Sequence, residues 1–433
     1  MISWPPENEP RRLREGSLEE WQTSSIFYGW WIVLAAFLMA LYVAGTVFFG
    51  FTAFVEPIVR EFGWSYTQVS LIVALRGVNM GLFAPAAGYL VDHYGSRKVV
   101  IFGSLTLGAG LILAGRAESL AWFFGAFLLI SFGAGGCTSV VLMKAAASWF
   151  NRRAGLAMGL VACGFGAGGA LVGLDVVLID NLGWRTAMLW LGVGSWLAGV
   201  PAALLFRDRP EDLGLRPDGD PPDQTPDGTP ATGPAAGPAV STVLKSWSYW
   251  RLNLSETFRL MVLTAVVLHI MPCLSNLGFN RSQGALLASA IPLLSILGRV
   301  GFGWLGDLYD KKIVMAAAIG SMGLGLAALS FSRHSWLLGP FLIFFSPGFG
   351  GATTLRGAII REYFGSAAFG RLLGVTMGAS SIGGIVGPVL AGWAFDAWGT
   401  YDHIWLVFAG LAAAAAVLVL TIGPPQAQQP TKA

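Results

Sequence analysis

Long apolar stretches separated by short polar segments recur along the whole chain. A helix that crosses the hydrocarbon core of a bilayer needs about 20 mostly apolar residues, and twelve stretches come close to or exceed that length. The first six cover residues 29–55, 65–91, 98–115, 119–148, 154–179 and 184–206. The second six cover residues 256–279, 283–306, 312–331, 336–362, 369–395 and 402–423. The pattern predicts an all-α integral membrane protein with twelve transmembrane helices.

The segment between the sixth and seventh predicted helices has a different composition. Residues 207–246 contain no aromatic side chain and are rich in proline, which is typical of a disordered linker. The predicted organisation is an N-terminal tail (1–28), a six-helix bundle (29–206), a linker (207–250), a second six-helix bundle (251–423) and a C-terminal tail (424–433).

Composition agrees with this interpretation and excludes several classes of protein. Hydrophobic residues make up 55% of the chain and charged residues only 12%, about half the charged fraction of a soluble domain. A soluble enzyme is therefore excluded, and the net charge of +3 without a basic run excludes a nucleic-acid-binding protein. Three cysteines in apolar stretches and scattered histidines form no metal-binding spacing, so we expect neither a metal nor a cofactor.

Lysine and arginine indicate how the helices are oriented. If both tails face the cytoplasm, most basic residues outside the predicted helices fall on the cytoplasmic side, as the positive-inside rule requires. No cleaved signal peptide is recognisable at the N-terminus. We expect a multi-pass protein of a bacterial inner membrane with both termini in the cytoplasm.

Two segments of the first half recur in the second half at one common offset. Gly88-Tyr-Leu-Val-Asp92 and Gly303-Trp-Leu-Gly-Asp307 each precede a basic pair, and Gly135-Gly-Cys-Thr138 matches Gly350-Gly-Ala-Thr353. Parallel six-helix repeats place a binding site near the midplane between the halves. The charged members of the two loops are expected to latch the inner side in one conformation: Asp92, Arg97, Asp307 and Lys311. The alternative is a pair of solvated loops that only obey the positive-inside rule.

The repeated loop, G-x-L-x-D followed by a basic pair, resembles the signature of the major facilitator superfamily. Further stretches resemble its branch of oxalate/formate antiporters and monocarboxylate transporters: Tyr28–Trp31, Trp149–Gly159, Gly183–Arg185, Gly387-Pro388 and Gly392–Asp396. The resemblance implies two six-helix pseudo-repeats and transport of organic anions by alternating access, as proton symport or anion exchange. It also implies that the arginine of the eighth helix, here Arg299, contacts a carboxylate.

Two departures from that branch are visible. The eleventh predicted helix has no lysine or arginine after Arg371, whereas the oxalate exchanger has a lysine there. Ser295 stands where animal lactate carriers have an aspartate. A second contact to a dicarboxylate and the proton coupling of the lactate carriers are therefore in doubt.

Five basic residues fall inside the predicted helices: Arg76, Lys144, Arg259, Arg299 and Arg356. A charge at the bilayer centre costs about 2.5–3.5 kcal/mol on insertion scales, and few carboxylates fall at the same depth. A cavity with this surplus of positive charge favours an anion.

The depth of each cation suggests its role. Arg299 lies roughly 12 Å from the loop that holds Asp307, and a guanidinium can hold a carboxylate with two parallel hydrogen bonds. We expect it to bind the substrate; the alternative is a structural arginine bonded to a backbone carbonyl or to a polar group of a partner helix. Arg76 lies deepest, on one face with Asn79, and is expected to bind substrate or gate, with an ion pair to Asp175 as the alternative.

The other three cations lie nearer to the cytoplasmic ends. We expect Lys144 and Arg356 to extend to the lipid headgroups, with inner-gate charges as the alternative interpretation. Arg259, beside Glu256 at the start of the seventh predicted helix, is expected to form an interfacial pair.

Neutral polar residues near the middle of the helices are candidates for the cavity wall: Tyr42, Thr46, His269, Asn276, Asn280 and Ser295. Each could instead be packed core. His269 is the one that could carry a proton near neutral pH.

Glycines of the fifth and eleventh predicted helices are expected to permit close helix packing. They are Gly155, Gly159, Gly164, Gly166, Gly168 and Gly169 in the fifth, and Gly374, Gly378, Gly383, Gly384 and Gly387 in the eleventh. The G-x-G-x-x-G spacing at Gly164 lacks the strand that a dinucleotide-binding site needs.

The sequence thus favours a monomeric secondary transporter in the bilayer. Its expected substrate is a small organic anion, a monocarboxylate, moved together with protons or against a counter-anion. The alternative is a proton-driven efflux pump for amphipathic compounds. A transport-inactive receptor or scaffold and a membrane enzyme are two further hypotheses, and neither a signalling domain nor a catalytic constellation supports them.

Overall fold

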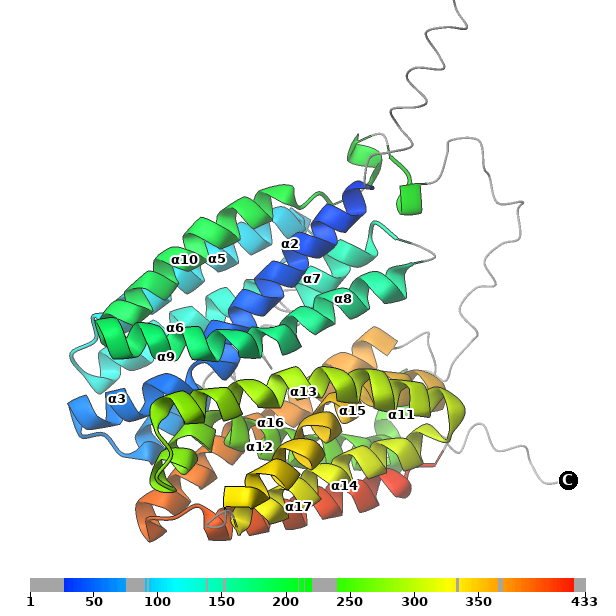
Figure 1. Ribbon diagram of the computed structural model, residues 1–433. Helices are drawn as coiled ribbons and strands as arrows, with labels where there is room; N and C mark the ends of the chain where they lie inside the picture. The colour runs from blue at the N-terminus through cyan, green and yellow to red at the C-terminus, as the bar shows by residue number, and fades with distance from the viewer. Residues whose placement is uncertain are drawn as a thin grey trace, which may run out of the picture.

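The computed structural model describes residues 27–74, 90–91, 93–137, 139–150, 153–208, 210–213, 215–219, 240–331, 335–364 and 369–423. All regular secondary structure in these ranges is helical (Figure 1). Eleven helices of the described chain are long and apolar enough to cross a membrane. The second predicted helix is described as helix only at 66–74 and 90–91, and Arg76, Asn79 and Asp92 lie outside the described residues.

The N-terminal bundle follows the predicted order of helices. Its elements are α2 (Tyr28–Val43), the π-helix η1 (Ala44–Phe49), α3 (Thr52–Phe62), α5 (Ser96–Gly115), α6 (Leu120–Gly136), α7 (Ser139–Ala147), α8 (Ala154–Ala167), the 3₁₀ turn η2 (Gly168–Ala170), α9 (Leu171–Leu182) and α10 (Trp184–Leu205). The first crossing therefore consists of α2, η1 and α3, and it ends at Phe62 rather than near residue 55 because Gly63 adopts a left-handed conformation there.

The C-terminal bundle contains longer helices. They are α12 (Trp247–Asn276), α13 (Arg281–Leu308), α14 (Lys311–Ser330), α15 (Leu338–Phe364), α16 (Phe369–Trp398) and α17 (Asp402–Leu420), with the short turn η5 (Ser335–Leu337) before α15. We call the end at which α5 and α14 begin the inner end, and the opposite end the outer end.

The predicted linker contains helical structure at both of its described parts. Turns η3 (Pro210–Leu213) and η4 (Pro217–Gly219) follow α10, and α11 (Val240–Lys245) leads into α12. The seventh helix therefore begins at Trp247, whereas the hydrophobic pattern places its start at residue 256. Val243, Tyr249 and Leu252 are fully buried, so packing against the bundle holds these turns although polar residues dilute their pattern.

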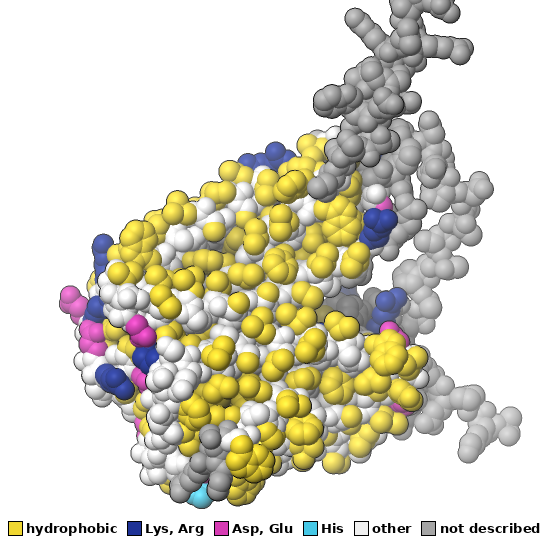
Figure 2. Space-filling view, viewed as in Figure 1, with side chains coloured by type: hydrophobic (Ala, Val, Ile, Leu, Met, Phe, Trp, Pro, Cys, Tyr) yellow, Lys and Arg dark blue, Asp and Glu magenta, His cyan; other side chains and the backbone are white. Residues whose placement is uncertain are grey.

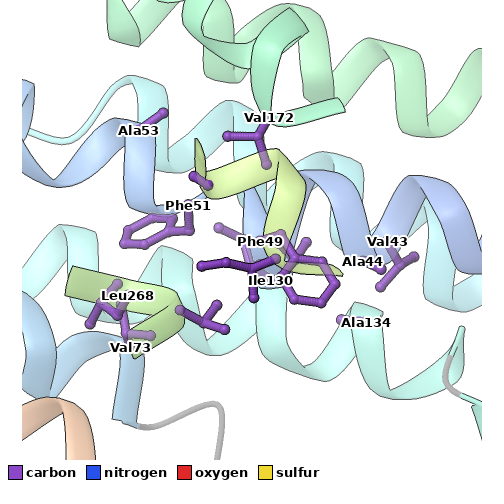
Figure 3. Close-up of a cluster of buried hydrophobic side chains, with 14 of the residues drawn as sticks. Val43, Ala44, Phe49, Phe51, Ala53, Val73, Ile130, Ala134, Val172 and Leu268 are labelled. Atoms are coloured by element: carbon purple, nitrogen blue, oxygen red, sulfur yellow. The ribbon is translucent and has the colours of Figure 1, made fainter. Parts of the chain in front are cut away.

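The two bundles lie side by side and share one hydrophobic core (Figure 1). α13 packs on α8, η2 and α9, and α12 packs on α3. Figure 3 shows part of this core, to which Phe49 and Ile130 of the N-terminal bundle and Leu268 of α12 belong. On the face shown in Figure 2, hydrophobic side chains cover most of the length of the molecule and charged side chains gather mainly at its two ends, as expected for a bilayer-embedded bundle.

Several of the glycines confirm the expectation of close packing. A side chain at Gly164 or Gly168 would collide with the backbone of α2, and one at Gly166 or Gly169 would collide with α13. Likewise Gly383 and Gly387 lie against backbone carbonyls of α12. The expectation is wrong for three others, since Gly159, Gly374 and Gly378 have no neighbouring atom within 4 Å of a built Cβ.

A further close glycine contact, between α15 and α13, predicts a large effect on stability. A Cβ at Gly350 would overlap the carbonyl oxygen of Ser295 in α13, and backbone cannot yield as a flexible side chain does. Gly350→Ala should therefore lower the thermal unfolding temperature in detergent, by an overpacking cost of about 1–3 kcal/mol. Gly320→Ala in α14 is the matched control, because nothing lies within 4 Å of its Cβ. Equal unfolding temperatures for the two variants would contradict the packing described.

Candidate functional site

Four charged side chains of the C-terminal bundle lie at a similar depth in the membrane span. Glu256 and Arg259 belong to α12, Arg299 to α13 and Arg356 to α15. Each is about eight to twelve residues from the inner end of its helix, or about 12–18 Å. We call these four residues the charged layer.

One carboxylate in this layer serves two guanidinium groups. Nε and Nη2 of Arg259 donate to the two oxygens of Glu256 at 2.9 and 2.8 Å, and the side chains are only 2% and 0% exposed. Arg356 donates to Oε2 of the same carboxylate at 3.4 Å. The bidentate pair has the geometry that makes Arg–carboxylate bonds strong.

These contacts correct two expectations about the inner cations. The Arg259–Glu256 pair is buried rather than interfacial, because α12 begins nine residues before Glu256 and so places it more than two turns inside. Arg356 does not extend to the headgroups: its side chain is 16% exposed and reaches Glu256 instead. Lys144, in contrast, is exposed on α7.

Arg299 extends from the C-terminal bundle to the N-terminal one. Its Nη1 donates to the carbonyl oxygen of Ala162 in α8 at 3.1 Å, and its guanidinium carbon lies 5.9 Å from the ring centre of Phe349. Arg259 and the neighbouring Cys163 are close enough to interact with it electrostatically. In this conformation Arg299 thus makes the backbone contact that the sequence allowed as an alternative.

The charged layer has an excess of positive charge and of hydrogen-bond donors. It contains three arginines and one glutamate, and the Nε atoms of Arg299 and Arg356 have no hydrogen-bond partner in the described part of the chain. Buried donors without acceptors are costly. An anion that reached this layer would gain both charge neutralisation and hydrogen bonds.

Four other predicted wall residues donate to backbone carbonyls and do not contact Arg299. Tyr42 donates to the carbonyl of Leu191, Thr46 to that of Tyr42, and Asn276 weakly to that of Gly399. Ser295 is buried and donates to Pro292, one turn earlier in its own helix.

His269 forms a buried link between the bundles. Its Nε2 lies 2.9 Å from the hydroxyl of Ser70 and 3.0 Å from the carbonyl of Pro388, and Nδ1 lies 3.0 Å from the hydroxyl of Tyr401. Because a carbonyl only accepts, Nε2 carries the hydrogen and Nδ1 accepts from Tyr401. A neutral imidazole therefore satisfies this network, nearer to the outer end than the charged layer.

Polar contacts close the outer end of the interface. Arg281 of α13 pairs with Asp180 of α9 at 2.8 Å and donates to the carbonyl of Ala53 at 3.2 Å. Asp396 of α16 accepts from the backbone of Tyr66 and Thr67, at the start of a helix, where an anion is favoured. The sequence does not single out Arg281 and Asp180 because they lie at helix ends, where charges are expected anyway, and Asp396 enters only as the end of the Gly392–Asp396 stretch.

At the inner end, the charged loops make contacts within their own bundle. Lys311 pairs with Glu362 of α15 at 2.6 Å, Asp310 caps α14, and Asp307 is exposed. Arg97 is half-buried in the first turn of α5, next to Ser96, whose amide donates to Asp208 at 2.6 Å. The latch between the bundles that the repeat predicts stays a prediction.

A small apolar recess lies between the charged layer and the outer contacts. Its walls come from both bundles: Phe49, Thr52, Val267, Ile270, Ala288 and Ile291. Thr52 also donates to the carbonyl of Leu268 at 2.8 Å across the interface.

Comparison with known proteins decides the family. The model of the Major Facilitator Superfamily matches residues 32–271 and 257–433, nearly the whole chain. The chain belongs to this superfamily. It is thus a multi-pass membrane transporter and not an enzyme, and the expected fold class is confirmed.

Curated relatives agree with the branch that the sequence motifs suggested. The chain is 27% identical over 398 residues to monocarboxylate transporter 13 of Rattus norvegicus, covering 91% of this chain and 89% of the relative. It is 26% identical over 406 residues to monocarboxylate transporter 12 of Homo sapiens, covering 88% and 77%. The resemblance to monocarboxylate transporters is therefore confirmed.

Solved structures agree with the fold. A bacterial homologue of the human lysosomal transporter Spinster, in an inward-facing and unoccupied conformation, superposes with a TM-score of 0.69 at 15% identity. The match covers 92% of this chain and 95% of that one.

Proposed function

We propose that this transporter carries a small organic anion, a monocarboxylate, by alternating access, and that the charged layer is where the anion binds. The observation that carries the proposal is the buried excess of arginine over carboxylate, with Arg299 joining the two bundles at that depth. The names of the curated relatives support the same substrate class.

Arg299 can exchange one acceptor for a better one. It now donates to the neutral carbonyl of Ala162, and hydrogen bonds to an ionised acceptor are roughly twice as strong as those between neutral groups. A carboxylate would therefore displace the carbonyl and take the free Nε donor as well. Because the carbonyl belongs to the opposite bundle, anion binding would release one contact between the bundles.

Arg259 and Arg356 would act mainly through their charge. Glu256 neutralises one of them, and the remaining positive charge raises the affinity of the layer for anions. For the binding site to open to the outer side, the contacts of Arg281 and Asp396 at the outer end would break and the inner loops would approach each other. We place the chain in a bacterial inner membrane with both termini in the cytoplasm, on the basis of its lysine and arginine distribution.

Uptake into proteoliposomes tests this function. Vesicles with purified protein should take up radiolabelled formate, acetate, lactate or pyruvate with saturation, either with an acidic outside or with unlabelled anion inside. Protein-free vesicles are the control. Absence of saturable uptake for the whole panel would contradict the proposal, and resistance to amphipathic compounds on overexpression would then favour the efflux pump.

A further inference from the structure

Asp175 is a buried acid that the charged layer does not use. It lies in α9, about seven residues or 10 Å from the outer end of that helix. Its side chain is completely buried, and neither carboxylate oxygen has a hydrogen-bond partner in the described part of the chain. Among the described residues it is thus a membrane-embedded carboxyl group without a donor or a counter-charge in contact.

The first crossing encloses this carboxyl group at its point of irregular geometry. The π-helix η1 ends at Phe49, and a side chain at the next residue, Gly50, would overlap Oδ2 of Asp175. The amide of Gly50 donates to Gly45 at 2.6 Å, so this nearby donor is already used. The acid can approach the backbone this closely only because residue 50 is glycine.

The charged and titratable groups around α9 are otherwise engaged. Tyr42 is near enough to interact electrostatically with Asp175, but its hydroxyl donates to Leu191. On the helices packed against α9 most of the described charged residues have partners: Glu56 with Arg60, Glu61 with Arg185, Arg281 with Asp180, and Arg299 with the carbonyl of Ala162. Asp307 of α13 is exposed at the inner end, far along the helix from Asp175.

These surroundings determine the protonation state. An ionised carboxylate without hydrogen bonds in a low-dielectric interior is very costly, and such a group takes up a proton instead. The carboxyl must gain water or a donor before it can release that proton. Movement of the first crossing would admit both, because Gly50, the residue directly after η1, lies against the carboxyl group.

The first crossing is also the segment that links Asp175 to the transport cycle. Two residues after Gly50, Thr52 bonds to Leu268 of the opposite bundle, and Arg281 bonds to Ala53. When these outer contacts break, the backbone next to Asp175 loses its anchors. π-Segments inside helices occur frequently at functional sites, and this one lies between the acid and the interface.

We propose that Asp175 is the proton-binding residue of this transporter. It takes up a proton when the outer end opens, keeps it while the first crossing is closed over it, and releases it in a later conformation. One proton and one monocarboxylate then cross together without net charge. This inference rests on the proposed function and selects symport over exchange.

The isosteric variant Asp175→Asn tests it, because asparagine imitates the protonated acid but cannot release a proton. Under an inward proton gradient, the wild-type protein accumulates labelled carboxylate above equilibrium. Asp175→Asn should not accumulate it beyond the level of protein-free vesicles, whereas counterflow against internal unlabelled carboxylate should continue near the wild-type rate. Glu118→Gln, which neutralises an exposed acid between α5 and α6, should behave as the wild type.

Several outcomes would overturn the proposal. One is gradient-driven accumulation by Asp175→Asn; another is wild-type counterflow without any accumulation in a proton gradient. A strongly lowered unfolding temperature of Asp175→Asn would mean that the folded protein needs an ionised carboxylate at this position, and that result would also overturn the proposal. Infrared difference spectroscopy separates failure of this proposal from failure of the proposed transport function. The carbonyl band of a protonated carboxyl group should be present in the wild type and absent in Asp175→Asn, even if no carboxylate is transported.

Discussion

Replacing Arg299 by glutamine should abolish carboxylate uptake while the protein still folds. Glutamine is neutral and smaller than arginine, so it leaves no buried charge and causes no overlap, although its shorter side chain gives up the bond that Nη1 of Arg299 makes to the carbonyl of Ala162. It lacks the positive charge and the paired donors that a carboxylate requires. Loss of two charge-assisted hydrogen bonds should lower uptake by about a hundredfold or more.

Two measurements check this expectation. The first is initial uptake in proteoliposomes, with Arg60→Gln as the matched control, because Arg60 is 77% exposed at the outer end. The second is thiol labelling of Cys163, which is half-buried beside the Ala162–Arg299 contact, whereas Cys137 and Cys273 are buried. A bound carboxylate should slow labelling of Cys163 in the wild type and not in Arg299→Gln. Uptake by Arg299→Gln at the wild-type rate would contradict the assignment of Arg299.

Replacing Glu256 by glutamine should give the largest loss of stability. The change leaves Arg259 and Arg356 buried without their shared carboxylate, and breaking a buried pair by removing one partner costs about 3–5 kcal/mol. The unfolding temperature in detergent measures the loss. Glu362→Gln is the control. The side chain of Glu362 is 48% exposed and that of its partner Lys311 is 25% exposed, and exposed pairs of this kind contribute about 0–1 kcal/mol.

A second substitution separates charge imbalance from lost packing. In Glu256→Gln/Arg356→Gln the net charge of the three residues returns to its original value, so part of the lost stability should be regained. If the double variant is no more stable than Glu256→Gln alone, charge imbalance is not the cause.

Most helices of the described fold could be predicted from the hydrophobic pattern, because a span in lipid must be apolar over its whole length. The hydrophobic pattern does not predict helix ends where a helix is held by packing within the protein rather than by contact with lipid. The first two turns of α12 contain Asn253 and Arg251, yet Tyr249 and Leu252 hold them on the bundle. That shift of one helix start moved Glu256 from the expected interface to the charged layer.

The candidate site could be predicted from the sequence in part, because helix geometry fixes the depth of a residue but not its partners on other helices. The depth of Arg299 follows from helix rise alone, and it lies where the sequence placed it. Its partner at Ala162 is a backbone group 137 residues away, and no side-chain pattern reveals such a contact. The bond from Arg356 to Glu256 joins α15 to α12 and likewise depends on how the helices are arranged. The glycine spacing that starts at Gly164, in contrast, predicts close helix packing from the sequence alone, and that prediction is confirmed.

The contact between η2 and the middle of α13 has a mechanical consequence. Gly169 faces the ring of Pro292, and Gly166 faces Ile296 one turn further along α13, so the bundles meet there without interlocking side chains. A joint of this kind can act as a pivot, because glycine backbone on one side leaves few side chains to displace when one bundle rotates over the other. The energy needed for that rotation would then be set mainly by the polar contacts around the joint, such as that of Arg299 with Ala162 and that of Arg281 with Asp180.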